Sequence, residues 1–95
     1  MLGIINKKRY DTETAIEIAT TDLRDGSNTY YNGRTDSLYR TKKGAFFIAS
    51  FTQWQGEQDQ IEVVEEAAAI KYYEKAYNQI VDFEDAFPGV EVEDA

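Results

Sequence analysis

The chain has 95 residues, with ten Lys and Arg against eighteen Asp and Glu, and a formal net charge of −8. Its length suits one domain with a thin core, and its 42% hydrophobic residues are too many for a disordered acidic polymer. Because Cys and His are absent, disulfide frameworks, thiolate nucleophiles, catalytic triads and sites that use these ligands for metals are excluded.

The first 24 residues predict a strand, a short helix and a second strand. Ile4-Ile5 begins a strand that continues into basic residues. Asp11 and Thr12 can accept hydrogen bonds from the free N–H groups of a first helical turn, so a helix of one or two turns is expected there. The β-branched residues that follow favour a strand over residues 17–24.

Residues 38–51 carry the clearest pattern, that of a β-hairpin. Two strand-like segments, 38–41 and 45–51, flank the turn Lys42-Lys43-Gly44, in which Gly44 can adopt a positive φ. Both faces of segment 45–51 are largely apolar, so this strand is predicted to be interior and covered on both sides.

The second half predicts helix. Six apolar residues recur at spacings of three and four, as on one face of a helix: Val63, Ala67, Ile70, Tyr73, Tyr77 and Ile80. A short second helix is expected within residues 80–87, followed by a frayed acidic tail over residues 89–95. The expected fold of the single domain 1–95 is therefore α+β. A small antiparallel sheet of three or four strands carries a short N-terminal helix and a longer C-terminal helix packed on it.

Negative charge is concentrated in the second half of the chain. Residues 1–50 have a net charge of +2, whereas residues 51–95 hold twelve acidic and two basic side chains. A rigid acidic surface can occupy a cationic groove that normally binds DNA or RNA. A solvated acidic face that only aids solubility is the alternative. The candidate contact residues in this half are Trp54, Glu57, Asp59, Glu65, Glu66, Asp82, Glu84 and Asp85.

Adjacent carboxylates such as Glu65 and Glu66 do not predict a metal site. Neighbouring residues on a helix diverge by about 100°, so their side chains do not converge on one ion. Neither a cofactor nor an enzymatic reaction is expected.

Aromatic residues in polar segments form a second candidate surface. Tyr30, Tyr31 and Trp54 offer large contact areas with polar tips, which are typical of protein interfaces. The alternative function is accordingly a structural or self-associating interaction module, including a homodimer. Direct nucleic-acid binding is not expected, because the net charge is negative and basic residues are not interleaved with stacking aromatics. No apolar run approaches the roughly 20 residues of a membrane span, and no export signal is visible, so a cytoplasmic location is expected.

Two segments resemble a family of small proteins found in bacteria, phages and mobile elements. Residues 8–15 follow the family pattern Lys-x-Tyr-Asp-Thr-x-Thr-Ala, and residues 38–47 follow Leu-Tyr-x-x-x-x-Gly-x-Phe-Phe. Residues 61–67 resemble the segment where a family strand runs into a helix, although Tyr72-Tyr73 stands where the commoner pattern has a Trp.

Proteins of this kind are frequent among anti-CRISPR and other anti-defence proteins. The resemblance implies a non-enzymatic inhibitor that acts in the host cytoplasm on a CRISPR effector or another bacterial defence protein. It implies no catalytic residue.

Overall fold

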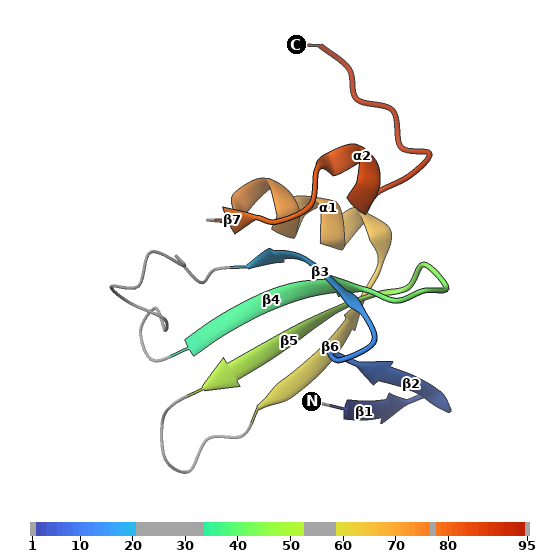
Figure 1. The fold of residues 1–95 in the computed structure, drawn as a ribbon, viewed down its shortest axis with the longest axis vertical. Helices are drawn as coiled ribbons and strands as arrows, with labels where there is room; N and C mark the ends of the chain where they lie inside the picture. Colours follow the sequence, from blue (N-terminus) through green and yellow to red (C-terminus); the bar gives the residue numbers. More distant parts are fainter. Residues whose placement is uncertain (1, 21–33, 53–58, 77, 95) are drawn as a thin grey trace.

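Two antiparallel sheets make up most of the fold (Figure 1). The computed structural model describes residues 2–20, 34–52, 59–76 and 78–94. The elements are β1 (Leu2–Ile5), β2 (Lys8–Asp11), β3 (Ile16–Thr20), β4 (Arg34–Arg40), β5 (Phe46–Thr52), β6 (Gln60–Val64), α1 (Glu66–Lys75), β7 (Asn78–Gln79) and α2 (Phe83–Ala86). β1 pairs with β2, and the other strands form a five-stranded sheet in the order β6-β5-β4-β3-β7.

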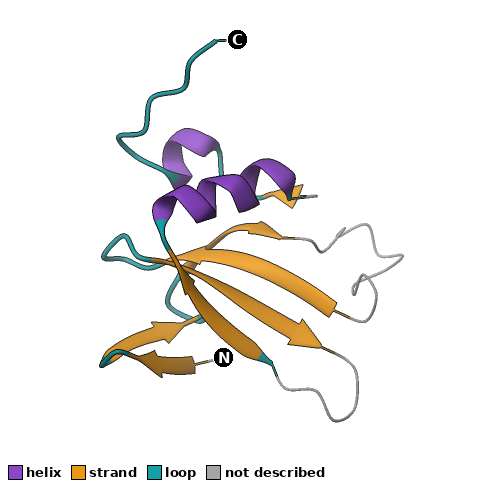
Figure 2. Ribbon diagram, turned by 180° about the vertical axis from the view of Figure 1, so that it is seen from behind, coloured by secondary structure: helices purple, strands orange, loops and turns teal. Residues whose placement is uncertain are grey.

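The five-stranded sheet lies between two covering layers (Figures 1 and 2). The helices α1 and α2 cover one face, where Ile18, Leu38 and Phe46 of the sheet meet Tyr73 and Phe87. The β1–β2 hairpin covers the opposite face. The main residues of this second core are Tyr10, Tyr39, Phe47 and Ala49.

β5 supplies both cores, as its two apolar faces predict. Phe46 belongs to the helix-side core, and the next residue, Phe47, belongs to the hairpin-side core. The turn between β4 and β5 places Gly44 at a φ of +91°, a conformation that other residues rarely adopt. The sequence-based prediction of this hairpin and of an interior strand is confirmed.

The expected helix after Asp11 is wrong. Asp11 ends β2, and the chain turns directly into β3. The carboxylate of Asp11 accepts a hydrogen bond from the N–H of Glu13 at 2.9 Å, and its carbonyl accepts one from the N–H of Ala15 at 3.0 Å. These hydrogen bonds close a single turn after Asp11. The chain then enters the sheet, where Ile16 pairs with Arg40. Side chain–backbone bonds of this kind compete with helix formation.

The expected long C-terminal helix is also wrong. α1 ends at Lys75, and the backbone of Ala76 is extended, with φ −67° and ψ 143°. Residues 78–79 then return to the sheet as β7, beside β3. Val63 belongs to β6, and Ile80 follows β7 outside any helix or strand, so the apolar spacing joined residues of α1 with residues before and after it. Tyr77 lies outside the described residues.

The observed architecture therefore corrects the predicted fold. The chain is mostly antiparallel sheet, with five strands in the main sheet and two in another, a ten-residue α1 and a four-residue α2. The acidic residues 90–94 belong to no helix or strand and run away from the body of the molecule (Figure 1).

Hydrogen bonds fix α1 on the sheet. The Tyr72 hydroxyl donates to the Asp36 carbonyl at 2.7 Å, and the Tyr73 hydroxyl donates to the Val81 carbonyl at 2.7 Å. At the end of the helix, Gln79 Nε2 donates to the Tyr73 carbonyl at 2.9 Å. Within the described part of the chain, every buried polar side-chain atom has a hydrogen-bond partner. These bonds hold the helix in one position.

The Tyr73 phenol should make stability depend on alkaline pH. Burial, and secondarily the Asp82 carboxylate, raise the pKa of Tyr73 above its ordinary 10.0. The folded state thus favours the neutral phenol. Its contribution to the free energy of unfolding is complete below about pH 10 and is lost as the pH rises through the pKa of Tyr73 in the folded state. Tyr73→Phe should cost about 1 kcal/mol at neutral pH, because it leaves the Val81 carbonyl without this donor.

Urea unfolding between neutral pH and about pH 11 measures this effect. The Tyr73→Phe variant should lose less stability than the unmodified protein over the alkaline part of this range. Ile61→Val, in the hairpin-side core, is the control. It should cost about 1 kcal/mol at all pH values, and its free energy of unfolding should fall with alkaline pH as steeply as that of the unmodified protein. If the free energy of unfolding of Tyr73→Phe fell just as steeply with alkaline pH, this role of the phenol would be contradicted.

Candidate functional site

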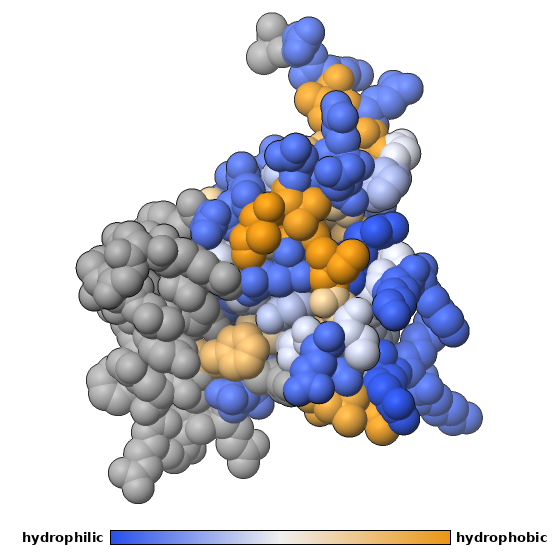
Figure 3. Space-filling model, viewed as in Figure 1, coloured by the Kyte–Doolittle hydropathy of each residue, from blue (hydrophilic) through white to orange (hydrophobic). Residues whose placement is uncertain are grey.

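The helix side of the molecule carries a set of exposed carboxylates. We name this set the acidic layer; it lies on α1, on α2 and along residues 90–94. Its nine members are Glu65, Glu66, Glu74, Asp82, Glu84, Asp85, Glu91, Glu93 and Asp94. Lys71 and Lys75 are the only basic residues within 65–94, so this segment has a net charge of −7. In Figure 3 hydrophilic side chains cover much of this end of the molecule.

Packing and helix electrostatics explain where these carboxylates stand. The apolar sides of α1 and α2 face the sheet through Ala69, Tyr73 and Phe87, so polar side chains of the helices point outward. Glu66 lies in the first turn of α1, where negative charge is favourable, and Lys75 lies in the last turn, where positive charge is favourable. The six members of the acidic layer within residues 65–85 are therefore held on a packed support.

Basic residues of the first half gather elsewhere, at two hairpin turns. Among the residues whose exposure the structure describes, the exposed ones are Lys7, Lys8 and Arg9 at the β1–β2 turn, and Lys42 and Lys43 at the β4–β5 turn. Both turns point toward the same side of the molecule (Figure 1). The β1–β2 turn lies far from the helices (Figure 1). The β4–β5 turn adjoins the start of α1, because Phe46 of β5 is paired with Val64 of β6 just before Glu65 and Glu66.

Five of the residues predicted from sequence are exposed at the starts of α1 and α2. Glu65, Glu66, Asp82, Glu84 and Asp85 all belong to the acidic layer. Asp59 is exposed immediately before β6, outside that layer. The predicted contacts Tyr30, Tyr31, Trp54 and Glu57 lie outside the described residues.

Sequence reasoning missed the other acidic members of the layer. Glu74, Glu91, Glu93 and Asp94 were counted in the charge of the second half but not named as contacts. The only sequence feature that pointed to these four residues was the excess of acidic over basic residues in the second half. It did not separate these four from Glu62, which lies on β6 outside the layer.

A groove of about 410 Å³ separates α2 from the segment that follows it. Its lining residues are Glu84, Phe87 and residues 89–92. Gly89 has a φ of +88°, and this bend directs the acidic end of the chain away from α2. Val90 is half-buried, Val92 is 67% exposed, and Glu84 and Glu91 are exposed. The groove thus combines apolar side chains with a negative rim.

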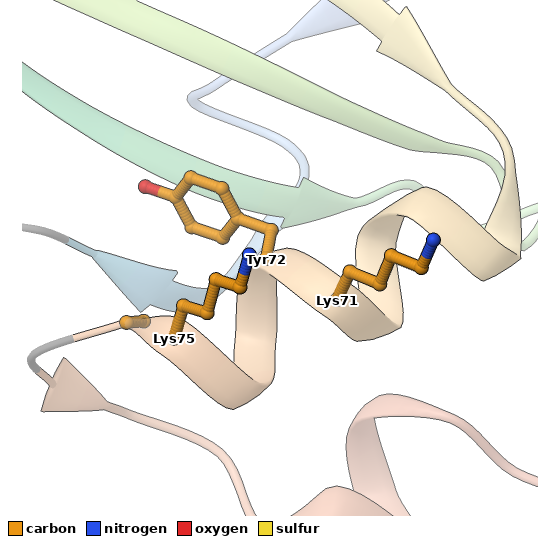
Figure 4. Close-up of a pocket in the computed structure, with 4 residues that line it drawn as sticks. Lys71, Tyr72 and Lys75 are labelled. Carbon is orange, nitrogen blue, oxygen red and sulfur yellow. The ribbon is translucent and has the colours of Figure 1, made fainter.

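A second cavity, of about 260 Å³, lies beside α1 (Figure 4). It is lined by Lys71, Tyr72, Lys75 and Ala76. The Tyr72 hydroxyl points toward the sheet, where it donates to Asp36. Two ammonium groups one helical turn apart can attract an anion, but no further polar group of α1 lines the space with them.

The described residues contain neither a cluster of metal-ligating side chains nor a membrane-spanning helix. No three acidic residues there converge as ligands of a metal ion. No helix in the same ranges has the length and apolar character needed to cross a membrane. In comparisons with protein-family models, curated proteins and solved structures, none matches this chain.

Proposed function

We propose that the protein binds a positively charged surface of a partner protein through the acidic layer and catalyses no reaction. The observation that carries this proposal is the placement of nine exposed carboxylates, with only two basic residues among them, on packed helices and the adjoining tail. A fixed field of one sign raises the rate of association with a surface of opposite sign.

A nucleic-acid-binding channel is the partner surface that this arrangement fits best. Such channels are lined with Lys and Arg at positions that neutralise phosphates. Carboxylates that are already ordered can take the place of those phosphates with little further loss of side-chain freedom. The protein then competes with DNA or RNA for the channel.

The partner class follows from the resemblance to small phage and mobile-element proteins. A nuclease complex of bacterial defence, above all a CRISPR effector, has a channel of this kind. We therefore propose an inhibitor of such a complex that acts in the host cytoplasm. Its acidic layer blocks access of nucleic acid to the channel.

Charge reversal tests this proposal. A variant with Lys at Glu65, Glu66, Asp82, Glu84 and Asp85 should bind a CRISPR effector at least about 100-fold more weakly, because five favourable charge contacts become repulsive. Competition with fluorescent target DNA on a panel of purified effectors measures the loss. Circular dichroism checks the fold. All five side chains are exposed, so the sheet should persist, but Lys at the N-termini of α1 and α2 should lower the stability of the helices.

A matched pair of double variants distinguishes the effect of where the charges lie from the effect of the net charge. Glu84→Lys with Asp85→Lys changes the acidic layer, whereas Glu13→Lys with Glu62→Lys makes the same charge change at exposed sites outside it. The first should weaken binding about tenfold or more, and the second by less than about threefold. Full inhibition by the five-site variant would contradict the proposal. Salt-insensitive binding that is lost on truncating Tyr30, Tyr31 and Trp54 would instead favour aromatic docking.

A further inference from the structure

The outward face of β1 exposes apolar side chains that the domain itself does not cover. Leu2 is 56% exposed and Ile4 is 67% exposed. The alternate residues face the sheet, because a Cβ at Gly3 would lie 3.1 Å from Ile61 and because Ile5 packs on the hairpin-side core. Leu2 and Ile4 therefore lie on the opposite, solvent-facing side of the strand.

Positive charge adjoins Ile4, whereas Leu2 is paired with Asp11. Ile4 is paired across the hairpin with Arg9, so both side chains are on the outward face. The turn itself consists of Asn6 and Lys7, with φ of 52° and 64°, and Lys8 follows. The hairpin thus presents an aliphatic pair flanked by Arg9 and Asp11 on its outward face, with Lys7 and Lys8 at the turn.

The groove beside α2 has the complementary chemistry. It offers Val90 and Val92 as apolar contacts and the carboxylates of Glu84 and Glu91 at its rim. In Figure 1 the hairpin and the segment after α2 stand at opposite ends of the longest dimension, which is 43 Å. Within one molecule the two surfaces are therefore far apart.

We propose that the β1–β2 hairpin of one copy docks in the α2 groove of a second copy. Leu2 and Ile4 contact Val90 and Val92, while the cations of the hairpin turn lie against Glu84 and Glu91. Because the two surfaces are different and stand at opposite ends, the first copy retains a free groove and the second copy retains a free hairpin. The contact then extends into open chains of molecules.

The size of this contact makes it weak. A ten-residue hairpin in a groove of about 410 Å³ buries less area than the roughly 1,600 Å² of a standard stable interface. Association should therefore require high protein concentration and low salt. A cationic partner bound to the acidic layer would cover the groove, so it should disperse the chains.

Sedimentation velocity on the intact protein tests the contact. At about 0.05 M salt the mean sedimentation coefficient should rise steadily toward about 1 mM protein, and at about 0.5 M salt this rise should largely disappear. A monomer at all concentrations in low salt would overturn the proposal.

Two charge-reversal variants locate the contact. One has Glu in place of Lys8 and Arg9, and the other has Lys in place of Glu84 and Glu91; all four side chains are exposed, so the fold should persist. Each variant alone should stay monomeric, because both of its docking surfaces carry the same sign. An equimolar mixture should recover association, since each groove then meets a hairpin of opposite charge.

Failure of the mixture to associate would overturn the proposal, as would unchanged association of either variant alone. Ile4→Ser is the apolar control, and it should weaken association while leaving all charges in place. These measurements use no partner protein, so their failure is distinct from failure of the proposed inhibition.

Discussion

Replacing Phe47 with Ala should lower the free energy of unfolding by about 3–5 kcal/mol, a large part of the total stability of a domain of this size. Phe47 is fully buried on the face opposite the helices. Its ring stacks on Tyr39 with centroids 5.2 Å apart, and it meets Tyr10 edge-on at 5.6 Å. Removal of the ring therefore leaves a cavity between the main sheet and the β1–β2 hairpin.

Urea unfolding followed by circular dichroism measures this loss. Phe47→Leu keeps most of the volume and should cost less than about 1.5 kcal/mol. Phe51→Ala, at a half-buried position on the same face, should cost less than Phe47→Ala. A loss below about 1 kcal/mol in Phe47→Ala would contradict a shared core between the two sheets.

Phe87→Ala should also cost about 3–5 kcal/mol, with its effect concentrated on α2. A four-residue helix has little stability of its own, so packing must hold it in place. The Phe87 ring provides that packing, with centroids 5.2 Å from Phe46, 5.5 Å from Tyr73 and 5.0 Å from Phe83. Without it, α2 and the residues after it should separate from the sheet.

Hydrogen exchange distinguishes this local loss from global unfolding. Amides of residues 85–87 should lose protection in Phe87→Ala, whereas the β4–β5 ladder should stay protected. The net charge remains −8, yet binding to a cationic partner should weaken, because Asp82, Glu84 and Asp85 lose their fixed positions. Equal loss of protection in α2 and in β5 would contradict this division of the core.

The parts of the fold that the sequence predicted are those set by local chemistry. The β4–β5 hairpin follows from Gly44 in the turn and from apolar residues on both faces of β5. The short helix near residue 83 is present as well. These features need no knowledge of distant segments.

The parts that were mispredicted depend on tertiary pairing. Asp11 has the chemistry of a helix start, but pairing of Ile16 with Arg40 draws the following residues into β3. β7 has only two residues and no strand-like composition, and it forms because β3 offers a free edge. The turn at Asn6 and Lys7 uses two positive φ angles without a glycine, so the β1–β2 hairpin had no clear signal.

The candidate site also has features that the sequence predicts and features that depend on the tertiary structure. The excess of acidic residues was visible in the sequence, and exposure of polar side chains on the outer side of α1 is expected from helix amphipathicity. The groove was not predictable, because it depends on the path of the chain after Gly89. The distance of the cationic β1–β2 turn from the acidic layer required the sheet topology.

The order of the strands has a consequence for how the molecule assembles. β3, β4 and β5 each pair with the next strand along the chain, and only β7 returns to the far edge, beside β3. Pairing between neighbours in sequence closes short loops, so it favours early nucleation in this meander. β7, α1 and α2 can dock only once β3 is in place. The surface that we propose for inhibition is thus completed late in folding, on a scaffold already formed without it.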